Sequence, residues 1–365
     1  MTATASGITR AANAGRAGKR TAGPIVVGTR GSALALWQTE YVVARLRERH
    51  PDVECRIEHI RTRGDQTQAL NIPLTQAGDK SMFVAELERA LLAGADSGLD
   101  ALDDRAADDR ATEAAGPTID LAVHSLKDLP SVLTPGLVLA AIPPREDPRD
   151  ALVTRDGRRL ADLPPGARVA TSSLRRRAQL LHLRPDLRIV DIRGNVDTRV
   201  RKTLAADGPD GAVLAAAGLK RLGLEHHISE YFAPEVLVPA VGQGALAAET
   251  RRGDRRIRRL LADVDDRPTR ICVEAERALL AHLGGGCLVP AGAYATLAPD
   301  GATIRLVAIV ADPDGARLLR AEAMGPAARS AALGRQVAAR LRRQGASAIL
   351  RGAVAALGGA ERADP

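Results

Sequence analysis

The sequence predicts an α/β fold, because strand and helix patterns alternate along most of the 365 residues. Short apolar runs of strand length recur, and loops that contain Gly, Ser or Thr follow them. Segments with apolar residues at helical spacing come next. Strands joined by helices build open sheets covered on both faces, and a chain of this length has room for two or three domains.

The folded part opens with "PIVVGTRGSALALWQTEYVVARLRERH". Residues 25–27 suit a buried strand, residues 28–32 a tight loop and residues 33–49 an amphipathic helix. A second strand is expected in "CRIEHIRTRGD". A helix is expected in "SMFVAELERALLAG", where Phe83, Leu87, Ala90 and Leu91 share one face.

A strand that ends before Pro130 is predicted in "TIDLAVHSLKDLP". The pattern of strand, loop and helix then recurs in "ARVATSSLRRRAQLLHL", "LRIVDIRGNVDTRVRKTLA" and "GAVLAAAGLKRLGL". Ligands of open α/β sheets bind at the carboxyl ends of the strands. The polar and charged residues of these segments fall at those ends, so we expect the functional site there.

Three regions depart from this pattern. Residues 1–23 contain four basic residues and no acid, and predict a disordered tail. Residues 93–117 carry seven acids against two arginines, and predict an exposed insertion. After about residue 265, a helical run, the strand-like "TIRLVAIVADPDG" and a helix near 327–342 predict a smaller α+β domain.

The composition limits the classes of function. A formal net charge of +8 favours an anionic partner. Aromatic residues make up only 2% of the chain, which disfavours nucleic-acid binding by base stacking. No apolar run reaches the length of a membrane span, and three dispersed cysteines predict neither a disulfide framework nor a metal site. We therefore expect a cytoplasmic protein with reduced thiols, no metal, and no nucleic-acid or membrane partner. A monomer is also expected, although the composition does not determine it.

The segment "TSSLRRRAQL" places arginines in the first turn of a helix, against the helix dipole. A solvated basic face is one explanation. A bound anion is the other, since helix-start amides and arginine side chains both favour anions. Arg175 and Arg176 follow the capping serines, and Arg193 and Arg199 flank the next loop, so we predict an anion site. No phosphate-binding glycine loop or dinucleotide fingerprint accompanies it, which leaves the choice between phosphate and carboxylate open.

Two further residues are candidates for chemistry. Asp128 follows Lys127 in a basic setting, where it stays ionised and could stabilise a cationic intermediate or carry protons; a simple turn pair with Lys127 is the alternative. Cys287 follows three glycines and is expected to be accessible, for a covalent role or for none. Cys272 is expected in the core, and His124 is expected to be structural.

Taken together, these segments resemble the porphobilinogen deaminase family of tetrapyrrole biosynthesis. The matching stretches occur in the family's order: "GTRGSALALWQTEYV", "TRGD", "FVAELERALL", "DLAVHSLKDLP", "REDPRDALV", "TSSLRRRAQL", "RGNVDTR", "AAAGLKRLGL", "PAVGQGA" and "GGGCLVP". The resemblance implies two doubly wound domains like those of type II periplasmic binding proteins, a smaller α+β domain, and an active site in the cleft between the first two.

The implied domain limits are residues 24–142 with 240–263 for the first domain, 147–238 for the second and 267–365 for the third. "REDPRD" and "PAVGQG" would then be the two crossings between the first two domains. Such crossings suggest hinge closure as the product grows.

The resemblance also implies the reaction, that of a transferase. Cys287 would carry a dipyrromethane cofactor through a thioether. Each porphobilinogen loses ammonia to give a cationic azafulvene, which the free α-carbon of the bound chain attacks. Four such cycles and a hydrolysis release the linear tetrapyrrole hydroxymethylbilane. Asp128 matches the family's catalytic aspartate.

Because every ring carries an acetate and a propionate, six rings bring twelve carboxylates into the cleft. The implied binders of cofactor and substrate carboxylates are Arg30, Ser32, Lys80, Ser125, Lys127, Thr171, Ser173, Arg175, Arg176, Arg193 and Arg199. Gln76 departs from the pattern, since a lysine is expected there.

Two other classes of function compete with this one. A non-catalytic anion receptor with a two-domain cleft would need the arginines but neither Asp128 nor Cys287. A nucleic-acid-binding protein is supported by charge alone, and would show a steep salt dependence.

Overall fold

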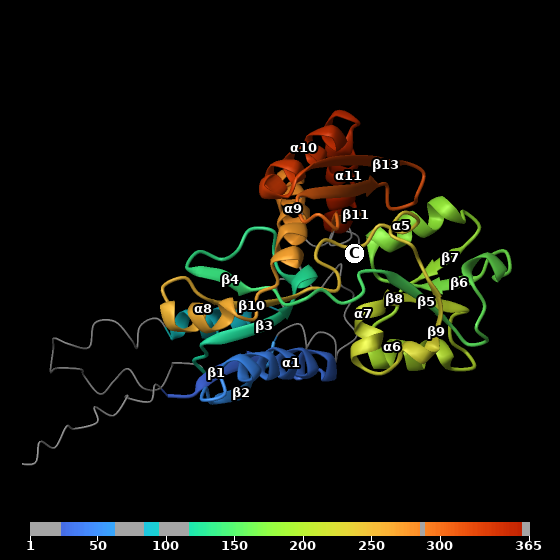
Figure 1. The fold of residues 1–365 in the computed structure, drawn as a ribbon. Coiled ribbons are helices and arrows are strands. Elements are labelled where there is room, and N and C mark those ends of the chain that lie inside the picture. Colours follow the sequence, from blue (N-terminus) through green and yellow to red (C-terminus); the bar gives the residue numbers. More distant parts are fainter. Residues whose placement is uncertain (1–22, 63–83, 95–116, 285–288, 360–365) are drawn as a thin grey trace, which may run out of the picture.

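The computed structural model describes residues 23–62, 84–94, 117–284 and 289–359. Figure 1 shows two α/β units side by side and a third unit above them. The described residues do not include residues 1–22 of the predicted tail, most of the acidic insertion, Gln76, Lys80, Phe83 or Cys287.

The first unit is built on a five-stranded sheet in the order β2-β1-β3-β10-β4. Its strands are β1 (Ile25–Thr29), β2 (Cys55–His59), β3 (Leu121–Ser125), β4 (Leu137–Ala141) and β10 (Leu246–Arg251). Helices α1 (Ala33–Arg49) and α8 (Arg255–Ala262) pack their apolar side chains on one face of this sheet, and α4 (Ala85–Ala93) packs on the other.

The second unit repeats this design in a sheet of order β7-β6-β8-β5-β9. Its strands are β5 (Asp150–Thr154), β6 (Arg168–Ala170), β7 (Arg188–Val190), β8 (Gly211–Ala215) and β9 (Ile228–Tyr231). Its helices are α5 (Leu174–Leu183), α6 (Val196–Leu204) and α7 (Ala216–Arg221); α5 packs in one core cluster, and α6 and α7 in another.

The two sheets share one topology. In each, three neighbouring strands are parallel and the fourth strand, β10 or β5, runs antiparallel to both of its neighbours. The predicted pair of α/β units is confirmed, and both sheets are mixed. The carboxyl ends of the parallel strands carry the segments that the sequence singled out.

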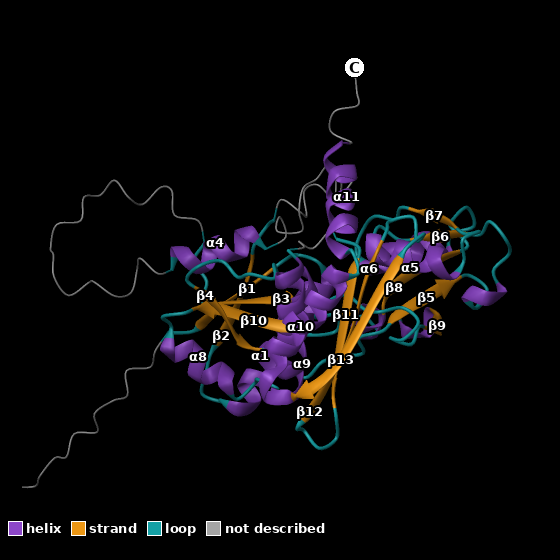
Figure 2. Ribbon diagram, turned by 90° about the horizontal axis from the view of Figure 1, so that it is seen from above, coloured by secondary structure: helices purple, strands orange, loops and turns teal. Residues whose placement is uncertain are grey.

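The third unit has an antiparallel sheet of order β11-β12-β13, and its α+β class is also confirmed. Its elements are α9 (Arg267–Leu283), β11 (Ala291–Leu297), β12 (Thr303–Ala311), β13 (Leu318–Pro326), α10 (Ser330–Arg343) and α11 (Ala346–Gly359). Figure 2 shows its long strands beside the second unit. As predicted, Cys272 of α9 is buried in the core of this unit.

One predicted boundary is wrong. The loop expected over residues 28–32 begins later, because Gly28 and Thr29 continue strand β1. A Cβ atom on Gly28 would lie 2.3 Å from Cδ1 of Ile119. The glycine therefore serves close packing within the strand rather than a turn.

No helix among the described residues is long and apolar enough to span a membrane.

Candidate active site

A cleft of about 320 Å³ is lined by residues of all three units. Loops after β1 and β3 form one wall, loops after β6 and β7 form the other, and Val289 and Ala291 of the third unit complete it. The predicted residues on its walls are Arg30, Ser32, Ser125, Lys127, Asp128, Ser173, Arg175, Arg176, Arg193 and Arg199. Thr171 is not on the lining, and Lys80 and Cys287 lie outside the described residues.

The start of α5 shows how the sequence builds this wall. The Ser173 hydroxyl caps the helix by accepting a hydrogen bond from the Arg176 amide at 3.4 Å. The Thr171 hydroxyl accepts one from the Ser173 amide at 3.2 Å and is buried. Thr171 therefore shapes the turn into the helix, while Ser173 faces the cleft.

The arginines at this helix start face a carboxylate of the protein itself. Asp150, on β5, is fully buried. Its Oδ2 lies 2.7 Å from Nη1 of Arg175, and its Oδ1 lies 2.9 Å from Nε of Arg176. Burial alone would raise the pKa of Asp150, but the charges of Arg175 and Arg176 outweigh it and hold that pKa far below its ordinary value. The unfavourable placement of arginines at the start of this helix is therefore offset, in part, by a buried carboxylate of the protein itself.

One carboxylate for two guanidiniums leaves a net positive charge at this wall. Arg175 also donates from Nη1 to the Val238 carbonyl at 2.6 Å, and Arg176 donates to the Val213 carbonyl at 3.1 Å. The Nε of Arg175 is buried and has no hydrogen-bond partner among the described residues. Both side chains are therefore held rigidly at the edge of the cleft.

Arg199 and Arg193 extend the positive wall. Arg199 donates from Nε to the Gly194 carbonyl at 2.8 Å. Burial, followed by repulsion from Arg176 and Arg193, lowers the pKa of Arg199 to about 10, and Asp128 acts in the opposite direction. Cations that repel one another in a desolvated wall bind an anion more strongly than isolated surface arginines do.

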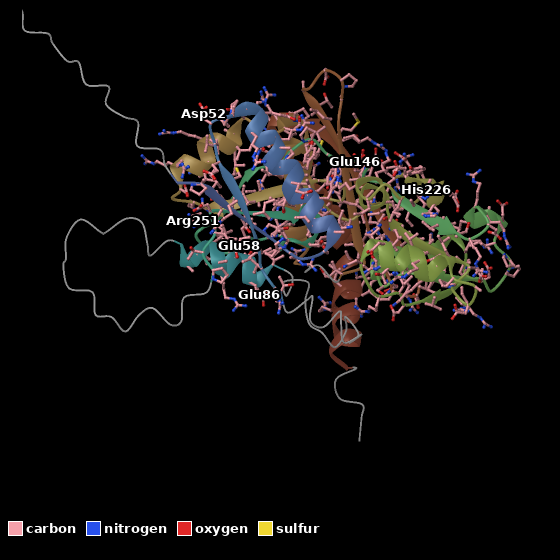
Figure 3. All side chains as sticks on the ribbon, turned by 90° about the horizontal axis from the view of Figure 1, so that it is seen from below. Asp52, Glu58, Glu86, Glu146, His226 and Arg251 are labelled. Atoms are coloured by element: carbon pink, nitrogen blue, oxygen red, sulfur yellow. The ribbon has the colours of Figure 1, made fainter. Side chains whose placement is uncertain are left out.

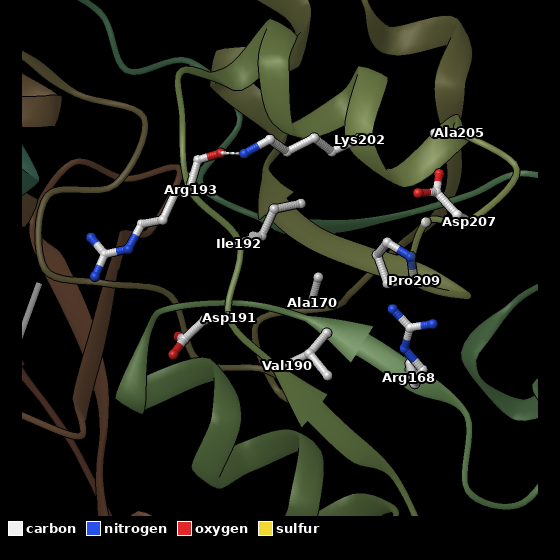
Figure 4. A pocket seen from close by; sticks show the side chains of 11 residues that line it. Arg168, Ala170, Val190, Asp191, Ile192, Arg193, Lys202, Ala205, Asp207 and Pro209 are labelled. Carbon is white, nitrogen blue, oxygen red and sulfur yellow. Dashed lines mark hydrogen bonds between the residues drawn. The ribbon is translucent and has the colours of Figure 1, made fainter. Parts of the chain in front are cut away.

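A second hollow lies behind this wall, between Arg168, Lys202 and the segment that ends at Arg193 (Figure 4). The Lys202 ammonium donates to the Arg193 carbonyl at 3.1 Å, as the dashed line shows. The Arg193 side chain points away from Lys202. This contact anchors the backbone from which Arg193 reaches the cleft.

The opposite wall carries Asp128 at the end of a short 3-10 turn, Leu126–Asp128, directly after β3. The Leu126 amide donates to the Ala245 carbonyl at 3.0 Å, which ties the turn to the second crossing. Ser125 is held by Gln38, whose Nε2 donates to the Ser125 hydroxyl at 2.9 Å. Asp128 and Arg199 attract each other electrostatically, so an acid of the first unit faces the arginines of the second.

Sequence reasoning missed one cleft arginine. Arg221, at the end of α7, lines the cleft and donates from Nη2 to the Gly244 carbonyl at 2.7 Å. Burial lowers the pKa of Arg221 to about 10. The available signal was its place in "AAAGLKRLGL", on a helix that follows the carboxyl end of a predicted strand.

The chain also matches models of a known protein family. A family model described as the dipyromethane cofactor binding domain of porphobilinogen deaminase matches residues 25–106 and 109–259. A second, for the C-terminal domain of porphobilinogen deaminase, matches residues 270–343. The chain belongs to the porphobilinogen deaminase family.

Curated porphobilinogen deaminases match almost their whole length. That of Syntrophotalea carbinolica is 49% identical over 324 residues, 89% of this chain and 94% of its own. That of a Roseiflexus species is 50% identical over 328 residues, 90% of this chain and 99% of its own. A solved periplasmic VFT2 domain of BvgS from Bordetella pertussis aligns with 66% of this chain and 86% of its own at 16% identity and a TM-score of 0.34, too weak a likeness to support an argument.

The cleft fits the dipyrromethane group of porphobilinogen deaminases. Two pyrroles with acetate and propionate side chains need several cationic donors in one place. Arg199 and Arg221 are desolvated cations with lowered pKa values, and Asp150 neutralises only one of its two arginine neighbours. Membership of this family therefore favours carboxylate over phosphate as the anion that the cleft binds.

Proposed function

We propose that this cleft is where four porphobilinogen molecules are deaminated and joined to a dipyrromethane primer before hydroxymethylbilane is released. The enzyme class follows from membership of the porphobilinogen deaminase family. The observation that supports the placement of the reaction is the opposition of Asp128 and Arg199 across a cleft with arginines along one wall. Asp128 is the catalytic residue in this proposal.

When bound, the dipyrromethane supplies the pyrrole α-carbon to which porphobilinogen units are joined. The Asp128 carboxylate accepts hydrogen bonds from pyrrole N–H groups and stabilises the positive charge that develops on the substrate as ammonia leaves. The arginines of the other wall hold substrate carboxylates, which keeps the reacting carbon near Asp128. Asp128 is partly buried, so its charge acts in a medium less polar than water.

The carboxylate binders are proposed from the same arrangement. Ten of the predicted binders or catalytic groups line one cleft. Thr171 acts through the turn that carries Ser173, and Arg175 offers the part of its guanidinium that Asp150 and Val238 leave available. Lys80 completes the set as a prediction from the resemblance.

Cys287 is the proposed attachment point. Val289, two residues further along the chain, lines the cleft, which supports an attachment point close to it in the sequence. The proposal also includes the domain limits 24–142 with 240–263, 147–238 and 267–365. The place of β10 in the first sheet and the packing of α8 against that sheet support them. A cytoplasmic monomer is the proposed working form.

The intact mass of the denatured protein tests the covalent step. The wild-type chain is expected to carry the added mass of two linked pyrroles, and Cys287→Ser is expected to lack it. Cys272→Ser is the matched control, since Cys272 is buried in the third unit, and it should retain the added mass. A wild-type protein that stays at the bare mass after incubation with porphobilinogen would favour the anion receptor instead.

A further inference from the structure

The first unit contains a buried pair of polar side chains that the reaction as described does not use. Nε2 of His124, on β3, lies 3.1 Å from Oε2 of Glu249, on β10. The His124 side chain is 4% exposed and that of Glu249 is 0% exposed. Neither Glu249 oxygen has a well-aligned hydrogen bond among the described residues, so His124 is its close polar neighbour there.

A third ionisable group lies near this pair. Glu88, on α4, interacts electrostatically with both His124 and Glu249, and it accepts a hydrogen bond from the Thr134 hydroxyl at 2.7 Å. Burial raises the pKa of Glu88, in part offset by the Thr134 bond. The three groups therefore occupy a desolvated space at the face of the sheet that α4 covers.

Stability does not account for such a pair. Removing a carboxylate from water is costly, and one imidazole with poor hydrogen-bond alignment offsets only part of the cost. Apolar side chains that fill the same volume often give equal or greater stability. We therefore expect the pair to position part of the structure rather than to stabilise the fold.

Its position suggests that role. His124 lines the cleft and is followed at once by Ser125 and the turn Leu126–Asp128. Its contact with Glu249 crosses from β3 to β10, and residues 240 and 243–245, just before β10, also line the cleft. The pair thus joins the two segments that meet beside Asp128.

We propose that His124 and Glu249 are positioning residues, which fix the carboxyl end of β3 against β10 and thereby set the orientation of Asp128 toward its substrate. This inference rests on the proposed catalytic role of Asp128. Four of the five arginines proposed to hold substrate carboxylates, Arg175, Arg176, Arg193 and Arg199, lie on the opposite wall. The pair should therefore affect the rate of the bound complex more than its formation.

The decisive variant is the double substitution His124→Met with Glu249→Leu. It removes both polar groups while it keeps the core filled. We expect a Tm equal to or above that of the wild type, a kcat about tenfold lower and a KM within about twofold. The conservative variant Glu249→Gln keeps a polar contact to His124, and its kcat should stay within about threefold of wild type.

An ion pair at the other end of the same two strands provides the control. Nη2 of Arg251 lies 2.8 Å from Oδ1 of Asp120, and Figure 3 places Arg251 far from Glu146 of the first crossing. The double substitution Arg251→Met with Asp120→Leu should leave kcat unchanged. A wild-type kcat in the His124/Glu249 double variant, or an equal loss in the control, would overturn the proposal.

Hydrogen exchange gives a second readout if the double variant does not fold. In the single variant Glu249→Leu, which removes the contact with His124, amides of residues 121–129 should exchange faster than in wild type, with no change in α1. Unchanged exchange there, together with an unchanged kcat, would also overturn the proposal. The two proposals fail separately, because a fully active Asp128→Asn would remove the catalytic role whatever the pair does.

Discussion

The two α/β units have the same strand order, yet their fourth strands carry carboxylates with different neighbours. In each, the antiparallel fourth strand carries a fully buried carboxylate, Asp150 on β5 and Glu249 on β10. Asp150 faces two guanidiniums, which are charged at every physiological pH, whereas Glu249 faces one imidazole, which is charged only when protonated. The second unit thus provides fixed positive charge. The first provides the proposed catalytic acid, Asp128, and the pair His124 and Glu249 proposed to position it.

The largest effect is expected at Asp150. Asp150→Asn leaves two guanidiniums buried without a counter-charge, so it should lower the free energy of unfolding by about 3–5 kcal/mol. Urea denaturation measures this. Asp186→Asn, which breaks the solvent-exposed pair with Arg184, should lower the free energy of unfolding far less, because water screens that pair. Equal losses of unfolding free energy in the two variants would contradict the prediction that the buried acid contributes more to stability than the exposed one.

Asp128→Asn should give the next largest effect. It keeps the shape of the side chain but removes the charge, so kcat should fall about 100-fold, or roughly 2.7 kcal/mol of barrier, while pyrroles still bind. Single-turnover kinetics separates binding from chemistry. The control is Asp197→Asn, an exposed acid of α6 outside the cleft lining. More than about a tenth of wild-type turnover would remove Asp128 from the central role.

Arg199 tests the fixed charge of the second unit. Arg199→Leu should lower kcat/KM about tenfold, roughly 1.4 kcal/mol, and Arg201→Leu, exposed on the same helix, should leave it unchanged. Because the pKa of Arg199 is lowered to about 10, its charge is present below that pH and is lost above it. The wild-type KM should therefore rise as the pH approaches 10, and a flat KM would contradict the assignment.

Glu88 gives the smallest effect and probes the first unit. Burial raises its folded-state pKa above the unfolded value, so its contribution to stability is present at acidic pH and is lost as the pH rises through the folded pKa. Glu88→Gln should raise the free energy of unfolding at pH 8 by less than about 1 kcal/mol, and leave it unchanged at pH 4. A gain of equal size at both pH values would exclude burial of the charge as its cause.

The local pattern of the sequence was sufficient for the elements that position the cleft. The amphipathic pattern of residues 33–49 predicted α1, and "TSSLRRRAQL" predicted the helix that begins after Ser173, because apolar periodicity and capping act within a few residues. The placement of candidate residues at strand ends followed from the same alternation. Gly28 misled the prediction, since a glycine in a turn and a glycine under a packed side chain look alike in sequence.

Residue types and their order along the chain thus determined the α/β class, the positive cleft and the family resemblance. Only the tertiary structure decided what each charge faces. Asp150 is 25 residues from Arg175, and Glu249 is far along the chain from His124, yet each pair meets in a desolvated interior. An ionisable group takes its energy from burial and from neighbours in space, and one sequence lists its residues without those distances.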